Sequence, residues 1–360
     1  MKLLERRKLK NLLLVCLSLL LIGMIGILGG CAPEEPVEEP APPEETEAPE
    51  EPEAPTEEPI VLEAVTFLDP GSRQGQWFQH VLDAIEDEMG DKITVDYLGG
   101  PEAIPGYELG EAIDRGIVDF CQLSFSWLQD RYPEAQVAGG LFPEFSPAEQ
   151  RDMGVNEFLN DGLSEAGVNV HYLGMMTIGY ETTLYVNFPV EDIDDLEGKI
   201  VRTSPLHRIA AESLGMEAMI TAPGELFSAL ERGVVEGYFW PAYISDLGLH
   251  EITDSRIKPG FGGSDAAVLI NTEVWGKIPA ELRDDFQETI DNALDDYYNN
   301  IMPEEVEKEE EILEEHGIET IEFPEEYRNI QLEGYKTFAE EEFGEDFAEE
   351  FFEKFFGDVF

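Results

Sequence analysis

The hydrophobic positions in the first part of the folded region change repeatedly between two periods. Val61–Phe67 and Lys92–Leu98 have strand-like patterns, and Ile117–Leu123 is an apolar run typical of a buried strand. Gln74–Met89 and Tyr107–Arg115 instead place their apolar residues at helical spacing. Strands that alternate with helices predict an α/β fold, in which a parallel or mixed sheet carries helices on its faces.

The same alternation returns later in the chain. Three strands separated by two helices are predicted from the same two periods. The strands are Lys199–Thr203, Met216–Ile220 and Val234–Phe239, and the helices are Pro205–Leu214 and Gly224–Arg232.

The closing segments of these two units are nearly copies of each other. Glu108–Asp119 reads ELGEAIDRGIVD, and Glu225–Glu236, which lies 117 residues further on, reads ELFSALERGVVE. In each copy a glycine, Gly116 or Gly233, stands where a helix C-cap would lead into the next strand. We therefore expect two α/β lobes of similar local design, with a ligand crevice between them at the carboxyl ends of their strands.

The first thirty residues have the pattern of an export signal. Basic residues between Lys2 and Lys10 precede an almost wholly apolar run from Asn11 to Gly30. The run ends in Leu28-Gly29-Gly30-Cys31, which resembles a bacterial lipobox, so residues 1–30 are predicted to be cleaved and Cys31 to be acylated. The competing interpretation is an uncleaved membrane anchor, because about 20 apolar residues can span a bilayer. Both interpretations place the remainder at the extracytoplasmic face of the cell membrane.

Residues 31–59 are predicted to form a tether behind the lipidated cysteine. Between Ala32 and Pro59 stand 12 Glu and 9 Pro. Because proline disfavours helix and sheet and the glutamates repel each other, this segment is expected to be extended and disordered. At ~3.1 Å per residue it would hold the domain up to roughly 85 Å from the bilayer. The alternative is a segment that contributes solubility alone.

The composition is strongly acidic, with 79 Asp and Glu against 22 Lys and Arg and a formal charge of −57. This charge argues against nucleic acid as a partner and against an anionic membrane surface as a direct ligand, since both would repel the protein. Segments such as Asp284–Asp296 and Glu304–Glu315 carry the charge into the folded region. This distribution suits a solvated acidic shell in a high-salt medium, where salt screens the repulsion. The alternative is an ordinary acidic extracellular protein.

The cysteines predict a domain without disulfides. If the signal leaves and Cys31 takes lipid, Cys121 is the one cysteine that remains. It lies in the apolar run Ile117–Leu123, so it is predicted to be a buried small hydrophobe rather than a nucleophile. Hydrophobic residues make up 42% of the chain, which is enough for the large core that such a domain needs.

The sequence contains no recognisable motif for catalysis, for a cofactor or for a metal. The five histidines lack the spacing of metal ligands, and His250-Glu251 lacks the second histidine of a zinc-protease helix. Neither a Gly-rich phosphate loop nor a Gly-x-Ser-x-Gly elbow occurs. We therefore expect a protein that is not an enzyme and uses no cofactor. A hydrolase built from scattered carboxylates is the alternative.

Arg202 is the cation that the pattern places best for a ligand. It follows a predicted strand and precedes Thr203-Ser204-Pro205, where a helix begins. This position at a carboxyl end faces the crevice, and the planar guanidinium there suits a bidentate carboxylate. The neighbouring helix N-terminus also favours an anion. The alternative is a surface arginine that pairs with one of the many acidic residues.

Residues at other strand ends are predicted to line the same crevice. The segment Tyr238–Pro241 ends a strand of the second unit, and within it Phe239 is expected to belong to the core rather than the wall. Strand ends of the first unit would supply the opposite wall, although Asp69–Ser72 also fits an ordinary turn. Besides Arg202, the predicted ligand-binding residues are Phe67, Arg73, Ser124, Trp127, Thr182, Tyr238, Trp240 and Pro241.

Five segments, in a fixed order, carry a resemblance to a known family. They are Tyr97–Glu102, Gly110–Asp119, Asp195–Arg202, Gly224–Trp240 and Leu269–Pro279. Together they resemble the DctP-type solute-binding proteins of tripartite ATP-independent periplasmic (TRAP) transporters. The resemblance implies a two-lobed, periplasmic-binding-protein-like α/β fold of type II-like design, with the ligand cleft between the lobes. It also implies a binding protein that delivers a small organic acid to membrane permease subunits, and we expect it to be a monomer.

The resemblance also bears on the site. In the family, the arginine that ends the Asp-Leu-x-Gly-x-x-x-Arg segment clamps a ligand carboxylate, and here that residue is Arg202. Members often carry a polar or acidic residue at or just before the position of Trp240, so Phe239-Trp240 argues against a metal-bridged ligand and implies a more apolar pocket. Some members use a second arginine, which Tyr180–Thr183 lacks, and this disfavours a sialic-acid-like ligand.

By the same resemblance, residues 60–179 plus 268–302 are expected to form lobe I, and residues 180–267 plus 303–360 lobe II. The helix that begins at Ala280 would then lead a chain crossing between the lobes. The phenylalanine-rich segment Glu325–Phe360 is predicted to be an amphipathic helix that packs on a lobe, and docking to a partner is the alternative. The alternative function is an envelope sensor or adhesion lipoprotein without a permease.

Overall fold

The computed structural model describes residues 59–241 and 243–357. The predicted signal peptide, Cys31 and the tether as far as residue 58 lie outside the described residues. Within the described ranges, no helix is long and apolar enough to cross a membrane.

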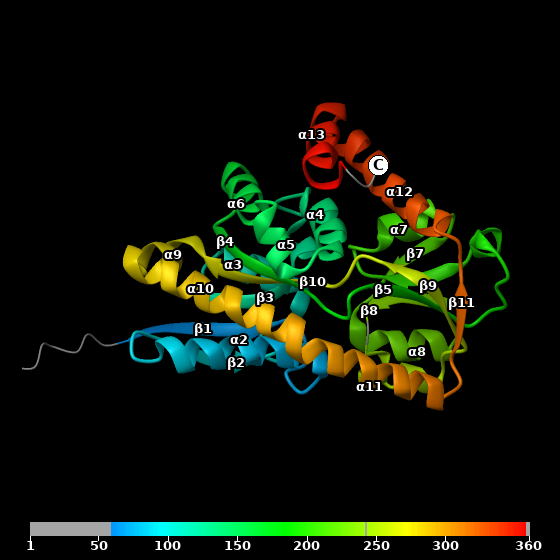
Figure 1. Ribbon diagram of the computed structural model, residues 1–360, viewed down its shortest axis with the longest axis horizontal. Helices are drawn as coiled ribbons and strands as arrows, with labels where there is room; N and C mark the ends of the chain where they lie inside the picture. Colours follow the sequence, from blue (N-terminus) through cyan, green and yellow to red (C-terminus); the bar gives the residue numbers. More distant parts are fainter. Residues whose placement is uncertain (1–58, 242, 358–360) are drawn as a thin grey trace, which may run out of the picture. The chain divides into compact units, whose positions relative to one another are not determined.

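The first sheet has five strands in the order β2-β1-β3-β10-β4 (Figure 1). Strand β1 pairs in parallel with β2 and β3, whereas β10 is antiparallel to β3 and to β4. The sheet is therefore mixed, and its strand β10 comes from a distant part of the sequence. The strands are β1 (Ile60–Thr66), β2 (Ile93–Gly99), β3 (Phe120–Ser124), β4 (Val170–Thr177) and β10 (Asp265–Asn271).

The second sheet has six strands in the order β11-β9-β5-β8-β6-β7. Strand β6 is parallel to β7 and β8, while β5 is antiparallel to β8 and β9. The two mixed sheets confirm the predicted α/β class. The strands are β5 (Thr182–Val186), β6 (Ile200–Thr203), β7 (Glu217–Ile220), β8 (Gly237–Pro241), β9 (Ser255–Phe261) and β11 (Glu319–Glu322).

Helices bury both faces of the first sheet. In β3, the side chain of Phe120 packs with Trp77 of one helix, whereas its neighbour Cys121 packs in the cluster of Leu109 from another. Cys121 is completely buried and free, which confirms its predicted role. The α-helices are α2 (Arg73–Met89), α3 (Gly106–Asp114), α4 (Ala135–Leu141), α5 (Pro147–Asp152), α6 (Val155–Glu165), α7 (Arg208–Ser213), α8 (Leu226–Glu231), α9 (Thr272–Lys277), α10 (Ala280–Asp296), α11 (Met302–Glu315), α12 (Glu326–Phe343) and α13 (Glu345–Phe356).

The two segments of similar sequence, Glu108–Asp119 and Glu225–Glu236, end their helices in the same way. Gly116 after α3 has a φ of 66° and Gly233 after α8 has a φ of 67°, a left-handed conformation that favours glycine. The following residue closes the turn in both copies: the N–H of Ile117 donates to Ala112, and the N–H of Val234 donates to Ala229, each over 2.9 Å. These bonds are those of a Schellman motif, so the predicted C-caps are confirmed.

A long helical run connects elements of the two sheets. Helix α10 continues through one π-helical segment, η7 (Tyr297–Ile301), into α11, and Figure 1 shows the three as one run. Met302 at its middle is buried in a cluster with strands of the first sheet, whereas Leu313 is buried with Tyr238 and Trp240 of the second. The helix predicted to begin at Ala280 therefore passes from one sheet to the other.

The C-terminal helices are packed rather than exposed. Phe351 and Phe355 of α13 lie 5.5 and 4.9 Å from Phe142, measured between ring centres, and both also contact Phe158. The predicted amphipathic packing is thus present. Phe142 and Phe158 belong to the segment expected for lobe I, whereas Tyr327 of α12 is buried with strands of the second sheet. Strand β10 begins at Asp265, and the expected bounds of the two lobes stay a prediction.

Candidate functional site

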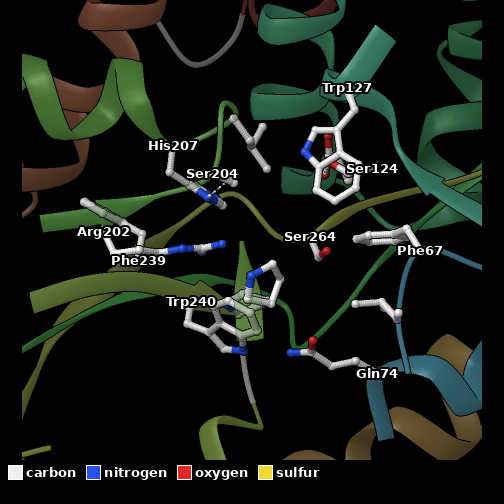
Figure 2. A pocket seen from close by; sticks show the side chains of 15 residues that line it. Phe67, Gln74, Ser124, Trp127, Arg202, Ser204, His207, Phe239, Trp240 and Ser264 are labelled. Carbon is white, nitrogen blue, oxygen red and sulfur yellow. Dashed lines mark hydrogen bonds between the residues drawn. The ribbon is translucent and has the colours of Figure 1, made fainter. Parts of the chain in front are cut away.

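A pocket lies where strand ends of the two sheets meet (Figure 2). Its empty space, part of which is open to solvent, amounts to about 480 Å³. Residues after β1 and at the end of β3 form one wall, and the ends of β6 and β8 form the other. Six of the predicted ligand-binding residues line it: Phe67, Ser124, Trp127, Arg202, Trp240 and Pro241.

Arg202 is buried at the end of β6 and reaches into the pocket (Figure 2). Only 3% of the residue is exposed, and its Nε and Nη2 atoms donate to the carbonyl oxygen of Thr221 over 3.2 and 2.9 Å. Burial lowers the pKa of Arg202 to about 10, so the side chain is still charged at neutral pH. Among the described residues, no carboxylate forms an ion pair with it. By contrast, the similarly buried Arg256 pairs with Glu310 over 2.5 Å.

Aromatic residues surround Arg202 on its own wall. Its guanidinium carbon lies 4.9 Å from the centre of the Trp240 ring. The Nε1 donor of Trp240 is buried and has no protein partner within residues 59–241 and 243–357. Phe239 belongs to the core, as predicted, but it also lines the pocket and stacks on His207.

The opposite wall carries a second aromatic group. Trp127 lies in the 3₁₀ turn η1 (Phe125–Leu128) and contacts Phe67 edge to face, with ring centres 5.1 Å apart. The exposed ring of Tyr107 covers Trp127 from the side of α3 at 4.4 Å. The Nε1 donor of Trp127 is also buried without a protein partner in the described part of the chain. Each wall therefore presents one indole N–H that no described protein group satisfies.

Asp265 is a pocket residue that the sequence analysis missed. It opens β10, is 2% exposed, and accepts hydrogen bonds from Ser124 Oγ at 2.7 Å and from the Ser126 N–H at 2.8 Å. Burial raises the pKa of Asp265 to about 6, although these hydrogen bonds oppose the shift. Helix α4 passes so close that a Cβ on Gly139 would lie 2.6 Å from Asp265 Oδ2. The available signal was an acidic residue at the start of the wholly apolar run Ala266–Ile270.

His207 and Ser204 also line the pocket without having been predicted, although they lie within five positions after Arg202. The Nδ1 atom of His207 lies 3.1 Å from Ser204 Oγ, and the histidine is 5% exposed. Burial, helped by the charge of Arg202, lowers the pKa of His207 to about 3, so its ring is neutral at neutral pH. The available signal for Ser204 was its place next to the end of β6, and for His207 its place at the start of α7. Other lining residues not predicted for the site are Leu68, Gln74, Leu206, Pro223 and Ser264.

Three predicted ligand-binding residues do not line the pocket. Arg73 is held by ion pairs with Asp246 at 2.8 Å and Glu309 at 2.5 Å. Tyr238 points to the other face of its strand, where its ring stacks on Tyr185 and its hydroxyl lies 2.7 Å from Thr253 Oγ1. The Thr182 hydroxyl donates to the carbonyl of Gly263. Among the residues described, no group of three or more His, Cys, Asp or Glu side chains could hold a metal.

The sequence matches one protein family over most of its length. The profile of the family described as bacterial extracellular solute-binding protein, family 7 (DctP), matches residues 65–344. The chain belongs to this family. The predicted resemblance is confirmed, and the family 7 assignment agrees with the prediction of a binding protein rather than an enzyme.

Two curated relatives share part of this family 7 chain. It is 24% identical over 195 residues to a monocarboxylate 2-oxoacid-binding periplasmic protein of Nostoc sp.. This match covers 52% of this chain and 53% of that protein. It is 29% identical over 142 residues to the C4-dicarboxylate-binding periplasmic protein DctP of Rhodobacter capsulatus. This match covers 39% of this chain and 42% of that protein. The chain thus matches about half the length of these relatives.

The fold of this family 7 protein is also found in solved structures. A TRAP periplasmic solute-binding protein from Desulfovibrio salexigens with bound orotic acid has a TM-score of 0.72 and 15% identity. The match covers 83% of this chain and 100% of that chain. At this identity the likeness concerns the fold, and it confirms the predicted two-lobed binding-protein class.

Proposed function

We propose that this family 7 protein captures a small organic acid outside the cytoplasm, binds its carboxylate with Arg202, and delivers it to the permease subunits of a TRAP-type transporter. The pocket between the two sheets would be the binding site. Arg202 would form the charged end of the site, and the aromatic residues of both walls would contact the rest of the ligand.

The unpaired charge of Arg202 is the observation that carries the proposal. Taking a charge out of water costs several kcal/mol unless an opposite charge and hydrogen bonds compensate for it. Thr221 engages two guanidinium nitrogens with one carbonyl oxygen, which leaves Nη1 and the positive charge for a ligand. A carboxylate meets both needs, because its two oxygens match the planar guanidinium.

The polar atoms around Arg202 support the same class of ligand. The indole N–H groups of Trp127 and Trp240 are buried donors that lack a protein acceptor in the described ranges. Buried donors are rarely left without a partner, so acceptor atoms of a ligand are the natural partners here. The relatives support the class as well, since 2-oxoacid monocarboxylates, C4-dicarboxylates and orotic acid all carry a carboxylate.

We further propose that the mature protein is a monomer that an acylated Cys31 holds at the membrane. The small residues before Cys31 and the Pro- and Glu-rich segment behind it support this part. Replacing Cys31 by Ser should release the protein from the membrane fraction into the soluble envelope fraction. Equal membrane recovery of the Cys31→Ser variant and the parent would contradict lipid anchoring through this residue.

The binding function is tested with the retained ligand. The protein is purified without denaturation, the small molecule that it retains is identified by mass spectrometry, and its affinity is measured by calorimetry. Arg202→Lys keeps the charge but loses the two-point geometry, so we expect the affinity to fall by roughly thirtyfold or more. Arg115→Lys, at an exposed arginine, is the matched control and should bind like the parent. A retained ligand without an acidic group, or full affinity in Arg202→Lys, would contradict the proposal.

A further inference from the structure

The lining of the pocket is dominated by rings. Phe67 and Trp127 stand on the wall of the first sheet, while His207, Phe239 and Trp240 stand on the other, as Figure 2 shows. The His207 ring is neutral and lies parallel to Phe239, with an angle of 5° between the two planes. Aromatic side chains interact best with flat, unsaturated partners, either stacked or edge to face.

The charges of the pocket limit the ligand to one carboxylate. Arg202 is the cation of the lining, and His207 adds no second positive charge because its pKa is lowered to about 3. The other ionisable side chain is Asp265, which is buried on the opposite wall. A second ligand carboxylate would meet this acid instead of a cation, and two like charges in a buried site repel each other strongly.

Two hydroxyl groups of the pocket, those of Ser124 and Ser204, are engaged with the protein. Ser124 donates to Asp265 and also lies 3.0 Å from Ser126 Oγ, and Ser204 is paired with His207. A ligand with many hydroxyl groups would bury several of them against rings, where each unpaired polar group costs free energy. The indole N–H groups of Trp127 and Trp240 can each take one ligand acceptor, but a ligand with many hydroxyl groups would exceed these partners. The lining therefore disfavours a polyhydroxy acid as well as a dicarboxylate.

We propose that the preferred ligand is a monocarboxylic acid whose body is a flat aromatic ring, held between Trp127 and Trp240 while Arg202 binds its carboxylate. This inference rests on the proposed function and narrows it to one class of acid. Trp127 acts as a specificity-determining residue for the ring, whereas Arg202 serves any carboxylate.

Four test ligands distinguish the contribution of the aromatic ring to binding from that of the carboxylate. Benzoate has both features, cyclohexanecarboxylate has a similar size without a flat ring, succinate has two carboxylates, and gluconate has many hydroxyl groups. Calorimetry on the full chain freed of retained ligand should give benzoate the tightest binding, by at least about tenfold over each of the other three, because each ring contact contributes a factor of about 2–13. Similar affinities for benzoate and cyclohexanecarboxylate would overturn the inference.

Two variants of Trp127 test whether this residue causes the preference for benzoate over cyclohexanecarboxylate. Trp127→Phe keeps a ring and should retain the preference for benzoate over cyclohexanecarboxylate. Trp127→Leu should lower the ratio of the benzoate affinity to the cyclohexanecarboxylate affinity by about fivefold or more. Circular dichroism and melting of both variants check that they fold. If Trp127→Leu keeps the full preference, the ring does not lie against Trp127 and the inference is wrong.

The outcomes also separate this inference from the proposed function. If succinate or gluconate binds more tightly than benzoate, and Arg202→Lys abolishes that binding, the carboxylate function stands and the aromatic class is wrong. If the acids bind equally well to Arg202→Lys and to the parent, the Arg202 clamp itself is wrong. Absence of benzoate binding overturns the aromatic class, and the Arg202 dependence of the retained ligand then decides the function.

Discussion

The guanidinium carbon of Arg202 lies 4.9 Å from the centre of the Trp240 ring, at the end of two neighbouring strands of the second sheet. A cation over an aromatic face gains about 0.5–2 kcal/mol, which offsets only part of the cost of burying the charge. The contact holds the guanidinium in place without neutralising it. Arg202 is therefore positioned for a ligand at the expense of the stability of the unliganded protein.

The first prediction concerns the stability of the protein without ligand. Arg202→Met removes the buried charge and keeps most of the side-chain volume, so the free energy of unfolding should stay within about 1 kcal/mol of the parent or rise. Lost hydrogen bonds to Thr221 act in the opposite direction and limit the gain. Urea unfolding of both proteins, freed of ligand, measures the difference. A loss of several kcal/mol would mean that Arg202 serves the fold rather than the ligand.

The second prediction concerns Arg73, whose partners Asp246 and Glu309 belong to elements far away in the sequence. Glu309 is 2% exposed, so Arg73→Met would leave a buried carboxylate without its cation and should destabilise the protein by about 2–5 kcal/mol. Because Arg73 does not line the pocket, ligand affinity should change little. Urea unfolding and calorimetry measure the two effects.

Two controls make the Arg73 result specific. Arg73→Met combined with Glu309→Gln should recover part of the lost stability, because the uncompensated charge is gone. Arg115→Met breaks an exposed pair with Glu111 and should cost less than about 0.5 kcal/mol. If the double variant is no more stable than Arg73→Met, the charge of Glu309 is not the cause.

The third prediction concerns the contribution of Asp265 to the pH dependence of the free energy of unfolding. Its pKa is about 6 in the folded protein and 3.8 as the ordinary value, so the native state holds this proton more tightly. The stabilisation that this proton gives to the folded protein is complete below pH 3.8 and is lost as the pH rises through about 6. Compared with the parent, Asp265→Asn should therefore gain relative stability between pH 4 and pH 7, by at most about 3 kcal/mol.

The other carboxylates contribute equally to the pH dependence of stability in the parent and in Asp265→Asn, so their contributions cancel when the two proteins are compared. Tyr172 and Tyr335 also act electrostatically on Asp265, but burial raises the pKa of each well above neutrality, so neither titrates in this range. Asn can still accept from the Ser126 N–H and donate to Ser124 Oγ, which preserves the packing. Parallel pH profiles of the two proteins would show that Asp265 is not the group with the raised pKa.

The fourth prediction concerns salt. The formal charge of −57 implies strong repulsion among surface carboxylates in the folded state, and the Debye length falls from about 10 Å at 0.1 M salt to about 3 Å at 1 M. The melting temperature of the unliganded protein should therefore be higher in molar NaCl than at low salt. Scanning calorimetry at both salt concentrations measures it. Equal melting temperatures, or a lower one in salt, would contradict the idea of an acidic shell that salt relieves.

Local patterns determined the elements of the fold. Hydrophobic periods of two and 3.6 predicted the strands and helices, because each period depends on residues that are neighbours along the chain. The two glycine C-caps were visible for the same reason, since Gly116 and Gly233 each close a turn made from their own helix. Arg202 was also found locally, since the end of a strand before a helix start is defined by adjacent residues.

The tertiary structure decided which strand ends form the pocket. Arg73 looked like a ligand residue, but it meets Asp246 and Glu309, which lie 173 and 236 positions further along the chain. Asp265 became a pocket residue because β10 enters the first sheet antiparallel between β3 and β4, so its first residue lies beside Ser124. The sequence carries the local period of each element, whereas these contacts depend on strand order and on pairing between distant segments, which only the packing of the whole chain fixes.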